Sequence, residues 1–350
     1  MLLHFKRSDI QLKLTDLDDF VNHIKFTQQL NSEEQYVVNF VLQLKNGSTH
    51  FSFKTSGSTG IPKEITLSRD QLFTSAANTL NFLAITSPIH VLLAINPTFI
   101  GGTMQIVRTY LLDGHLDIVP AQAVADLHNA HYDLTSLVPI QIAKIYEKAP
   151  HLLDQLGHIL VGGALIDPTL EQMLLADRRI NPSIFATYGM TETASHIALR
   201  KLGQPYFDTI GDTEIGFNEA YCMKIKSKVT QEAWLQTSDI VEIIAPTQFI
   251  WLGRHDFVIN TGGIKIPPEK IEALLKTQVS QNLMLTSLPD ELLGQRVVLL
   301  VEGNSIPKID FSSLSSYERP KAIYHLIDFS YTPSGKLDRR KTQQRFIESQ

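Results

Sequence analysis

The spacing of hydrophobic positions predicts a helix in the first part of the chain. In residues 32–45, SEEQYVVNFVLQLK, apolar side chains recur at the spacing of one helix face. Ser32 and Gln35 form a capping-box pattern at the start of this segment, and Asn46–Gly47 follows its end. We therefore expect a helix that is closed by a glycine cap, with a hairpin turn as the alternative interpretation.

Short apolar runs follow a second predicted helix, which we expect over 68–84 with Ser68 as its N-cap. The runs at 90–96 (HVLLAIN), 116–120 (LDIVP) and 158–163 (HILVGG) end in Asn, Pro or Gly. Continuous apolar runs of this length are typical of buried parallel strands, and the loops at their ends commonly bind ligands. The chain therefore alternates between helix and strand.

The pattern changes near residue 252. A polar loop that contains glycine and proline occupies 253–268, a helix is predicted over 269–279, and two strand-like runs and a charged tail follow. The sequence predicts an α/β protein with two domains. We expect residues 1–252 to form a large N-terminal domain of sheets flanked by helices, and residues 253–350 to form a small α+β C-terminal domain.

Composition and charge narrow the possible partners. The chain has 350 residues, of which 43% are hydrophobic, and its formal net charge is 31 − 36 = −5. This balance favours neither nucleic acid nor an anionic membrane surface as a partner. The single cysteine, Cys222, can form no disulfide within the chain, which fits a reducing cytoplasm. We see no signal-peptide core and no apolar run of membrane-spanning length, so we expect a cytoplasmic protein. The oligomeric state is left open.

A cluster of small donor residues lies between a strand-like run and the second predicted helix. A glycine-rich loop between a strand and a helix N-terminus can bind phosphate through backbone N–H groups and the helix dipole. In TSGSTGIPK, residues 55–63, Gly57 is followed after four residues by Pro62, and Lys63 is followed by Glu64. A Walker A loop requires glycine and a hydroxyl residue at those two places. The segment therefore predicts a phosphate loop of another kind, with a plain Ser/Gly turn as the alternative.

This loop resembles the phosphate loop of the acyl-adenylate-forming superfamily, which includes acyl-CoA ligases, luciferases and the adenylation domains of peptide synthetases. Further motifs of the family follow in order: LVGGALI at 160–166, TYGMTETAS at 187–195, LQTSDIVEI at 235–243, GRHDFVINTGGIKIPPEKIE at 253–272 and TPSGKLDRR at 332–340. Two residues depart from the family's pattern. Ser238 stands where the family has glycine, and Phe257 stands where a second acid is common.

The resemblance implies that the chain activates a carboxylic acid with ATP and then transfers the acyl group to CoA. Carboxylate and triphosphate are both anions, so donors and cations must stabilise the charge that develops on attack. The residues that the resemblance places around the phosphates and the adenine are Thr55, Ser56, Gly57, Ser58, Thr59, Gly60, Lys63, Gly163, Ala164, Tyr188 and Gly189.

Five further residues receive separate roles from the same resemblance. Asp239 would accept both ribose hydroxyls, because a carboxylate is acceptor-only, and Arg254 would add a second ribose contact. Glu192 would bind Mg²⁺ and Thr191 would contact the α-phosphate. Lys336 would bridge the carboxylate and α-phosphate oxygens as a point charge.

In the family, the small domain rotates between the two half-reactions. Asp256 occupies the hinge position in this chain. Gly262, Gly263 and Ile264 would form the CoA path, where glycine lets the backbone approach a slender pantetheine arm. An isolated Gly-Gly turn is the alternative.

Within the superfamily, the chain resembles the compact o-succinylbenzoate–CoA ligases of menaquinone synthesis. Only 54 residues precede the phosphate loop, so the usual N-terminal subdomain is shortened. Phe99 stands where acyl-CoA ligases often carry histidine. The expected acyl-substrate residues are Phe99, Gly102, Val138, Gly162, Ser195 and His196. Candidate donors for a second carboxylate are Ser195 and His196, with Arg108 as a more distant possibility that could equally lie on the surface.

Three alternatives share these motifs: a CoA ligase for another aryl or fatty acid, a stand-alone adenylation domain that loads a carrier protein, and an inactive ATP-binding regulator. The expected cofactors are ATP, Mg²⁺ and CoA, and the expected partners are small molecules. The twelve histidines show no zinc-site spacing, since His128 and His131 are three apart without further ligands. We therefore expect no metal held by histidine.

Overall fold

The computed structural model describes residues 1–22, 29–54, 63–86, 88–122, 131–332 and 337–349. Contacts group the chain into two compact units. Unit 1 comprises Met1–Ile166, Leu174–Glu214 and Ile225–Leu235, and unit 2 comprises Asp167–Met173, Ile215–Lys224 and Gln236–Gln350. The division into a fixed domain to residue 252 and a mobile domain from residue 253 stays a prediction.

Unit 1 contains strands β1 to β11, α-helices and short 3-10 turns. The strands are β1 (Leu2–Phe5), β2 (Ile10–Lys13), β3 (His50–Lys54), β4 (Glu64–Ser68), β5 (His90–Leu93), β6 (His115–Ile118), β7 (Leu134–Leu137), β8 (His158–Val161), β9 (Ser183–Met190), β10 (Ser195–Lys201) and β11 (Phe207–Thr209). The helices and turns are η1 (Leu14–Asp16), α1 (Leu17–Asn22), α3 (Ser32–Lys45), α4 (Arg69–Phe82), α5 (Ile100–Leu111), α6 (Pro139–Lys148), α7 (Leu152–Gln155), η3 (Thr191–Thr193) and η4 (Lys228–Thr230).

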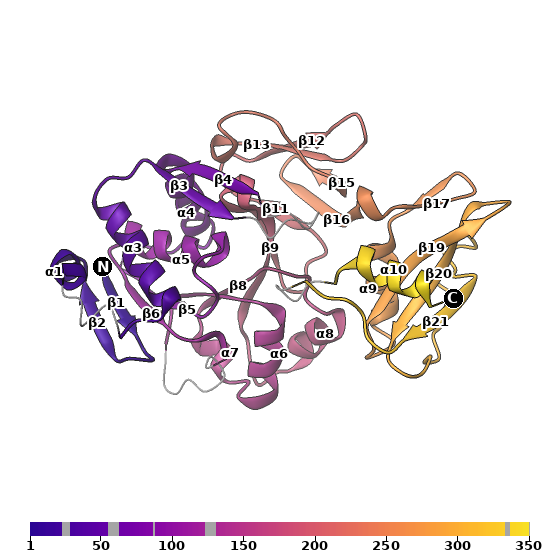
Figure 1. The fold of residues 1–350 in the computed structure, drawn as a ribbon, viewed down its shortest axis with the longest axis horizontal. Coiled ribbons are helices and arrows are strands. Elements are labelled where there is room, and N and C mark those ends of the chain that lie inside the picture. The colour runs from indigo at the N-terminus through magenta and orange to yellow at the C-terminus, as the bar shows by residue number, and fades with distance from the viewer. Residues whose placement is uncertain (23–28, 55–62, 87, 123–130, 333–336, 350) are drawn as a thin grey trace. The chain divides into compact units, whose positions relative to one another are not determined.

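The main sheet of unit 1 follows the order β11-β10-β9-β8-β7-β5-β6-β1-β2. From β9 to β1 the neighbouring strands run parallel, and the antiparallel strands β2, β10 and β11 extend the two sides. Figure 1 shows α3, α4 and α5 on one side of this sheet and α6 and α7 on the other. The expected buried parallel strands at 90–96, 116–120 and 158–163 are confirmed as β5, β6 and β8.

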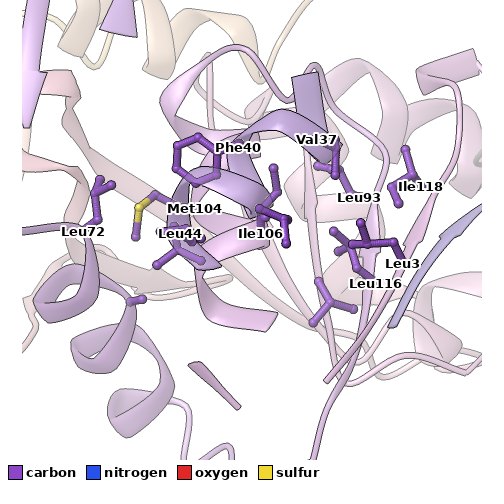
Figure 2. Close-up of a cluster of buried hydrophobic side chains, with 14 of the residues drawn as sticks. Leu3, Val37, Phe40, Leu44, Leu72, Leu93, Met104, Ile106, Leu116 and Ile118 are labelled. Carbon is purple, nitrogen blue, oxygen red and sulfur yellow. The ribbon is translucent and has the colours of Figure 1, made fainter. Parts of the chain in front are cut away.

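The core of unit 1 lies between the sheet and the helices α3 to α5. Figure 2 shows Phe40 and Leu44 of α3 near Met104 of α5, with Ile106 between this group and Leu93 and Leu116 of the sheet; all belong to one buried cluster. All six are at most 4% exposed. Helix α5 is buried along almost its whole length, from Gly102 to Thr109, because it packs against several elements at once.

Both predicted helices form, and one cap differs from the prediction. Ser68 accepts from Gln71 N as the N-cap of α4, as expected. In α3 the capping box is Asn31 with Glu34, so the prediction of Ser32 and Gln35 is wrong by one residue. Asparagine is at least as good an N-cap as serine, and the box one position earlier leaves Ser32 inside the helix. The glycine cap is confirmed, because Gly47 has φ +78°.

The segment after the predicted phosphate loop corrects another expectation. The loop was expected to lead directly into a helix N-terminus. Instead β4 follows it and pairs antiparallel with β3 in register, with His50 opposite Ser68 and Lys54 opposite Glu64. The run EITLS at 64–68 alternates and contains two β-branched residues, which favours a strand. Strand β4 therefore separates the N-terminus of α4 from the predicted phosphate loop along the chain.

The chain passes between the units through α8 (Pro168–Ala176), β12 (Glu214–Phe217), β13 (Met223–Lys226) and β14 (Leu235–Gln236). Unit 2 then contains the hairpin of β15 (Asp239–Ala245) and β16 (Gln248–Arg254), followed by η5 (His255–Phe257), β17 (Ile259–Thr261), β18 (Ile264–Ile266), α9 (Pro268–Lys276), β19 (Leu283–Asp290), β20 (Gly294–Glu302), β21 (Ala322–Leu326) and α10 (Arg339–Glu348). The predicted charged tail thus contains α10.

The second sheet of unit 2 has the order β18-β17-β20-β19, with β21 parallel to β20. Its two faces have separate cores because side chains alternate along the strands. Leu285 and Leu299 pack in one cluster with Leu275 of α9, and Met284 and Leu300 lie in another cluster that also contains residues of α10. Across the described parts of the chain, the helices are too short or too polar for a membrane span.

Candidate functional site

Part of the predicted site lies outside the described residues. These positions are Thr55, Ser56, Gly57, Ser58, Thr59 and Gly60 of the phosphate loop, and Lys336. Lys63 is described and exposed, just before β4. The roles of this group stay predictions from the resemblance.

The predicted adenine-side loop begins where β8 ends. Gly162 N donates to Leu137 O at 3.1 Å, which continues the parallel pairing for one more residue. Gly163 then takes φ +85°, a left-handed conformation that glycine adopts without steric cost. An added Cβ on Gly163 would lie 3.3 Å from Val138 Cγ1. The loop therefore brings Gly163 beside Val138, and the adenine and acyl-substrate roles of these residues stay predictions.

The second motif, TYGMTETAS, turns the chain from β9 into β10. Thr193 is fully buried, and its hydroxyl lies 2.6 Å from Ser195 O and 3.0 Å from Met190 N. Gly189 faces the returning strand so closely that a Cβ there would lie 2.1 Å from Ser195 O. The turn therefore depends on glycine at 189 and on the Thr193 hydroxyl.

This turn leaves the two predicted phosphate and metal residues at the surface. Thr191 is half-buried and Glu192 is exposed. Among the residues that the structure describes, none forms a hydrogen bond or ion pair with the Glu192 side chain. A solvated carboxylate is a suitable ligand for a hard cation such as Mg²⁺. The Tyr188 ring packs edge-on to Phe207, with 5.9 Å between the ring centroids.

The two predicted ribose residues face each other across the β15–β16 hairpin. Asp239 and Arg254 are partners in the antiparallel register. Trp251 Nε1 donates to Asp239 Oδ1 at 3.1 Å, and Asp239 N donates to Thr237 Oγ1 at 3.1 Å. The Trp251 contact orients the carboxylate, and the ribose role of the pair stays a prediction.

Arg254 is also bonded to the predicted hinge residue. Its Nη2 donates to Asp256 Oδ2 at 2.6 Å and also to Ser238 Oγ. Ser238 Oγ in turn lies 3.2 Å from Asp256 Oδ2. Ser238, which stands at the family's glycine position, therefore links Arg254 to Asp256. The Arg254 Nε atom is buried and has no hydrogen bond to a described residue.

The predicted CoA residues form the turn of the β17–β18 hairpin. Gly262 and Gly263 have φ +57° and +83°, the backbone that a tight two-residue hairpin turn requires. Gly262 N donates to Leu293 O at 2.9 Å, and both glycines and Ile264 are exposed. The turn geometry alone explains both glycines. Their CoA role stays a prediction.

The start of α5 carries two predicted acyl-substrate residues. Phe99 precedes the helix and is 47% exposed. Gly102 packs against the preceding loop, where a Cβ would lie 2.4 Å from Asn96 O. Glycine is therefore required there for packing.

One turn from the end of α5, Arg108 is 1% exposed, so the surface interpretation of this residue is wrong. Its Nη1 donates to Gln105 Oε1 at 3.0 Å and its Nη2 to Thr79 Oγ1 at 3.3 Å. Its Nε atom is buried without a partner, and no carboxylate within the described chain pairs with it. Burial lowers the pKa of the guanidinium to about 9, so it keeps its charge at neutral pH.

The same hydroxyl connects Arg108 to His196, which is 5% exposed. Thr79 Oγ1 lies 2.9 Å from His196 Nε2 and 3.0 Å from Ser75 O. The Thr79 hydroxyl has one hydrogen; with that hydrogen donated to Ser75 O, His196 Nε2 is the donor to Thr79. Burial and the nearby arginine hold the pKa of His196 well below its usual value, and the ring is neutral.

Sequence reasoning missed Thr79 and could not place Arg108. In IGGTMQIVRTYL at 100–111, Gln105, Arg108 and Thr109 recur at the spacing of one polar helix face. This pattern by itself indicates a solvent-facing stripe, so the burial of Arg108 had no local signal. Thr79 had no local signal, since it meets Arg108 and His196 only through folding.

Comparisons with known proteins confirm the resemblance. The sequence profile of the AMP-binding enzyme family matches residues 9–226. The chain is 28% identical over 326 residues to a probable 2-succinylbenzoate–CoA ligase of Mycobacterium tuberculosis, covering 83% of each. It is 25% identical over 276 residues to the 2-succinylbenzoate–CoA ligase of Staphylococcus epidermidis, covering 69% of this chain and 56% of that protein.

Solved structures agree on the fold. An acyl-CoA synthetase (AMP-forming)/AMP-acid ligase II-like protein of Dyadobacter fermentans is 33% identical, with a TM-score of 0.61 and coverage of 90% of this chain and 95% of that chain. The o-succinylbenzoate coenzyme A synthetase of Bacillus subtilis in complex with ATP and magnesium ion gives a TM-score of 0.73 at 20% identity, covering 83% and 69%. With its motifs in the family's order and more than half its length matched by the family profile, this chain belongs to the AMP-binding enzyme family.

Proposed function

We propose that the chain is an AMP-forming acid–CoA ligase whose acid is o-succinylbenzoate. In the first step the carboxylate attacks the α-phosphorus of ATP, pyrophosphate leaves and acyl-AMP forms. In the second step the CoA thiol attacks the acyl carbonyl and AMP leaves. Family membership, the order of the motifs and the relatives that carry this activity in their names support the proposal.

Each half-reaction has residues assigned to it. Lys336, Lys63, Thr191 and the phosphate loop would stabilise the charge on the phosphates during attack. The exposed Glu192 carboxylate fits Mg²⁺, which when bound neutralises phosphate charge. Asp239 and Arg254 would hold the ribose, and the hairpin turn at Gly262–Gly263 would admit the pantetheine arm.

One structural observation supports the identity of the acid. The Arg108 guanidinium is buried, and no carboxylate among the described residues pairs with it. A buried charge without a counter-ion is costly, and proteins seldom keep one unless a ligand completes it. o-Succinylbenzoate has two carboxylates. One is consumed by adenylation, and the ring carboxylate would remain as a buried anion that needs a cation. Arg108 supplies that cation in our proposal.

The hydrogen-bond pattern distinguishes Arg108 from the other two predicted donors. His196 uses its only N–H on Thr79, so its Nδ1 presents a lone pair and repels a carboxylate. Ser195 Oγ lies 3.5 Å from that Nδ1. We therefore assign His196 to positioning Thr79 and Arg108, and we leave the Ser195 hydroxyl as a secondary donor.

A panel of acids tests the proposal. AMP formation with ATP, Mg²⁺ and CoA should be at least about a hundredfold more efficient with o-succinylbenzoate than with benzoylpropionate, which lacks the ring carboxylate. Equal efficiency with the two acids, or a preference for long-chain fatty acids, would contradict the assigned substrate and leave the adenylation chemistry intact. A thioester found only on a carrier protein, and none on CoA, would contradict the assigned acceptor.

A further inference from the structure

A group of histidines surrounds one aspartate on the main sheet of unit 1. His4 lies on β1, His90 on β5, and His115 and Asp117 on β6, three strands that Figure 1 shows side by side. The parallel registers place His4 opposite Asp117 and His90 opposite His115. All four therefore project from one face of the sheet, and none belongs to the motifs described above.

One carboxylate oxygen is enclosed by nitrogen atoms but lacks a hydrogen bond. Asp117 is 1% exposed, and its Oδ1 lies 3.1 Å from both His4 Nδ1 and His115 Nε2. Asp117 Oδ1 and His115 Nε2 are nevertheless buried without a hydrogen-bond partner among the described residues. Donor atoms on a tetrahedral zinc ion at about 2.0–2.1 Å are separated by about 3.3 Å, close to these two spacings. All three atoms lie within 4.8 Å of one another.

The outer contacts fix which atoms face the centre. His4 Nε2 lies 3.1 Å from Asp9 Oδ1 in hydrogen-bond geometry, and a carboxylate accepts only. His4 Nε2 therefore carries a hydrogen, and Nδ1 is the ring atom that faces Asp117 Oδ1. Carboxylate–histidine pairs of this kind orient metal-binding imidazoles. On the other side, Tyr132 OH donates to Asp117 Oδ2 at 2.9 Å, which leaves Oδ1 for the centre.

Asp117 Oδ1 faces the ring nitrogens of two histidines and has no hydrogen-bond partner among the described residues. The neighbouring rings of His90 and His115 are stacked, with their centroids 4.4 Å apart. Lys6 Nζ lies 3.1 Å from Asp117 Oδ2, away from Oδ1, and compensates the aspartate without filling the gap between Oδ1 and the imidazoles. A single metal ion would satisfy Oδ1 and the two imidazole nitrogens that face it at once.

We propose that His4 Nδ1, His115 Nε2 and Asp117 Oδ1 bind a divalent transition-metal ion, with Zn²⁺ as the best match. Two imidazoles and a carboxylate form a normal zinc ligand set. His90 Nε2, which lies 3.2 Å from Asp117 Oδ2, or a water would complete the coordination. The ion would be structural, because it joins β1 to β6 within the sheet and is unrelated to the Mg²⁺ of the ATP site.

Zinc binding to the full chain tests this site. After chelator treatment and equilibrium dialysis against Zn²⁺, elemental analysis should find about one ion per chain with the wild type and none at the same free zinc in the double variant His4→Gln/His115→Gln. The matched control His151→Gln alters an exposed histidine at the start of α7 and should bind as the wild type does. Equal zinc in the double variant, or none in the wild type, would overturn the proposal.

Two further measurements keep the result independent of folding defects. Co²⁺ bound to the wild type should give the intense visible absorption of tetrahedral coordination, and a weak octahedral spectrum would contradict the site. If the double variant does not fold, the single variants His115→Gln and Asp9→Asn replace it. Asp9→Asn removes only the orienting carboxylate and should weaken zinc binding about tenfold, whereas unchanged affinity in both single variants would count against the assignment.

Discussion

Two arginines, one in each unit, have opposite surroundings. In unit 2, Arg339 lies with its Nε 3.8 Å from Glu269 Oε1, and its Nη2 donates to Glu272. In unit 1, Arg108 is more completely buried and has only the neutral partners Gln105 and Thr79 within the described chain. The first arginine is compensated by two acids, and the second is compensated by none.

The difference separates a structural cation from one available to a ligand. Arg339 connects α10 to α9, and removing it would leave two buried carboxylates without their cation. Removing Arg108 would deprive no described carboxylate of a cation, because none pairs with it. A residue that the folded chain does not need for charge balance is free to balance the charge of an anionic substrate, and this is the basis of the proposed acid.

The largest expected effect is the loss of the compensated cation. Arg339→Met should destabilise the protein by about 3–5 kcal/mol, because burial already raises the pKa of Glu269 and Glu272 and both carboxylates would lose their neighbouring charge. Urea unfolding at pH 7, followed by a signal from unit 2, measures this change. Arg108→Met is the matched variant and should leave stability unchanged or higher. Equal destabilisation by both variants would remove the contrast between the two arginines.

The next effect concerns catalysis. Arg108→Met should lower kcat/KM for o-succinylbenzoate at least about a hundredfold, because the ring carboxylate would lose its only buried cation. Activity with benzoylpropionate should change little. Measuring kcat/KM with both acids separates a substrate-binding role of Arg108 from a purely structural one, because a structural role would lower activity with both acids alike.

A smaller effect depends on pH and comes from Glu269. Burial raises the pKa of this group to about 7, above its usual 4.5. The folded state therefore binds the proton more tightly than the unfolded state, and this contribution to stability is complete below about pH 4.5 and lost as pH rises through 7. Relative to Glu269→Gln, the wild type should lose about 2 kcal/mol between pH 5 and pH 8. Unfolding curves of the two proteins at both pH values give the comparison, and a difference that does not change with pH would show that Glu269 stays ionised.

The smallest effect is expected at the hydroxyl that joins Arg108 to His196. Thr79→Val keeps the side-chain shape but removes the acceptor, and should cost about 1 kcal/mol of stability. Thr79→Ser keeps the hydroxyl and serves as the control. The valine variant should also raise the KM for o-succinylbenzoate, while the KM for benzoylpropionate stays near that of the wild type. A KM that rises for both acids would show that Thr79 shapes the whole pocket.

Much of the fold could be predicted because its signals are local. The helix after Ser68 is determined by a cap and the residues that follow it, and β5, β6 and β8 are continuous apolar runs. Two local features were still misjudged. Asn31 competes with Ser32 as the cap of α3, and the alternating residues 64–68 form β4 in a segment that was expected to lead into a helix.

The sequence by itself determined the family, the order of the motifs and the identity of most candidate site residues, because each motif is a short segment whose residues stay adjacent in any fold. Only the tertiary structure decided that Arg108 is buried without an acid and that Thr79 connects it to His196, since these residues come from α5, α4 and β10. The same holds for His4, His115 and Asp117. They are more than a hundred residues apart at the extremes, and parallel strand pairing brings them together. The spacing of residues along the chain cannot reveal this cluster, because the cluster forms only when the strands pair in the folded sheet.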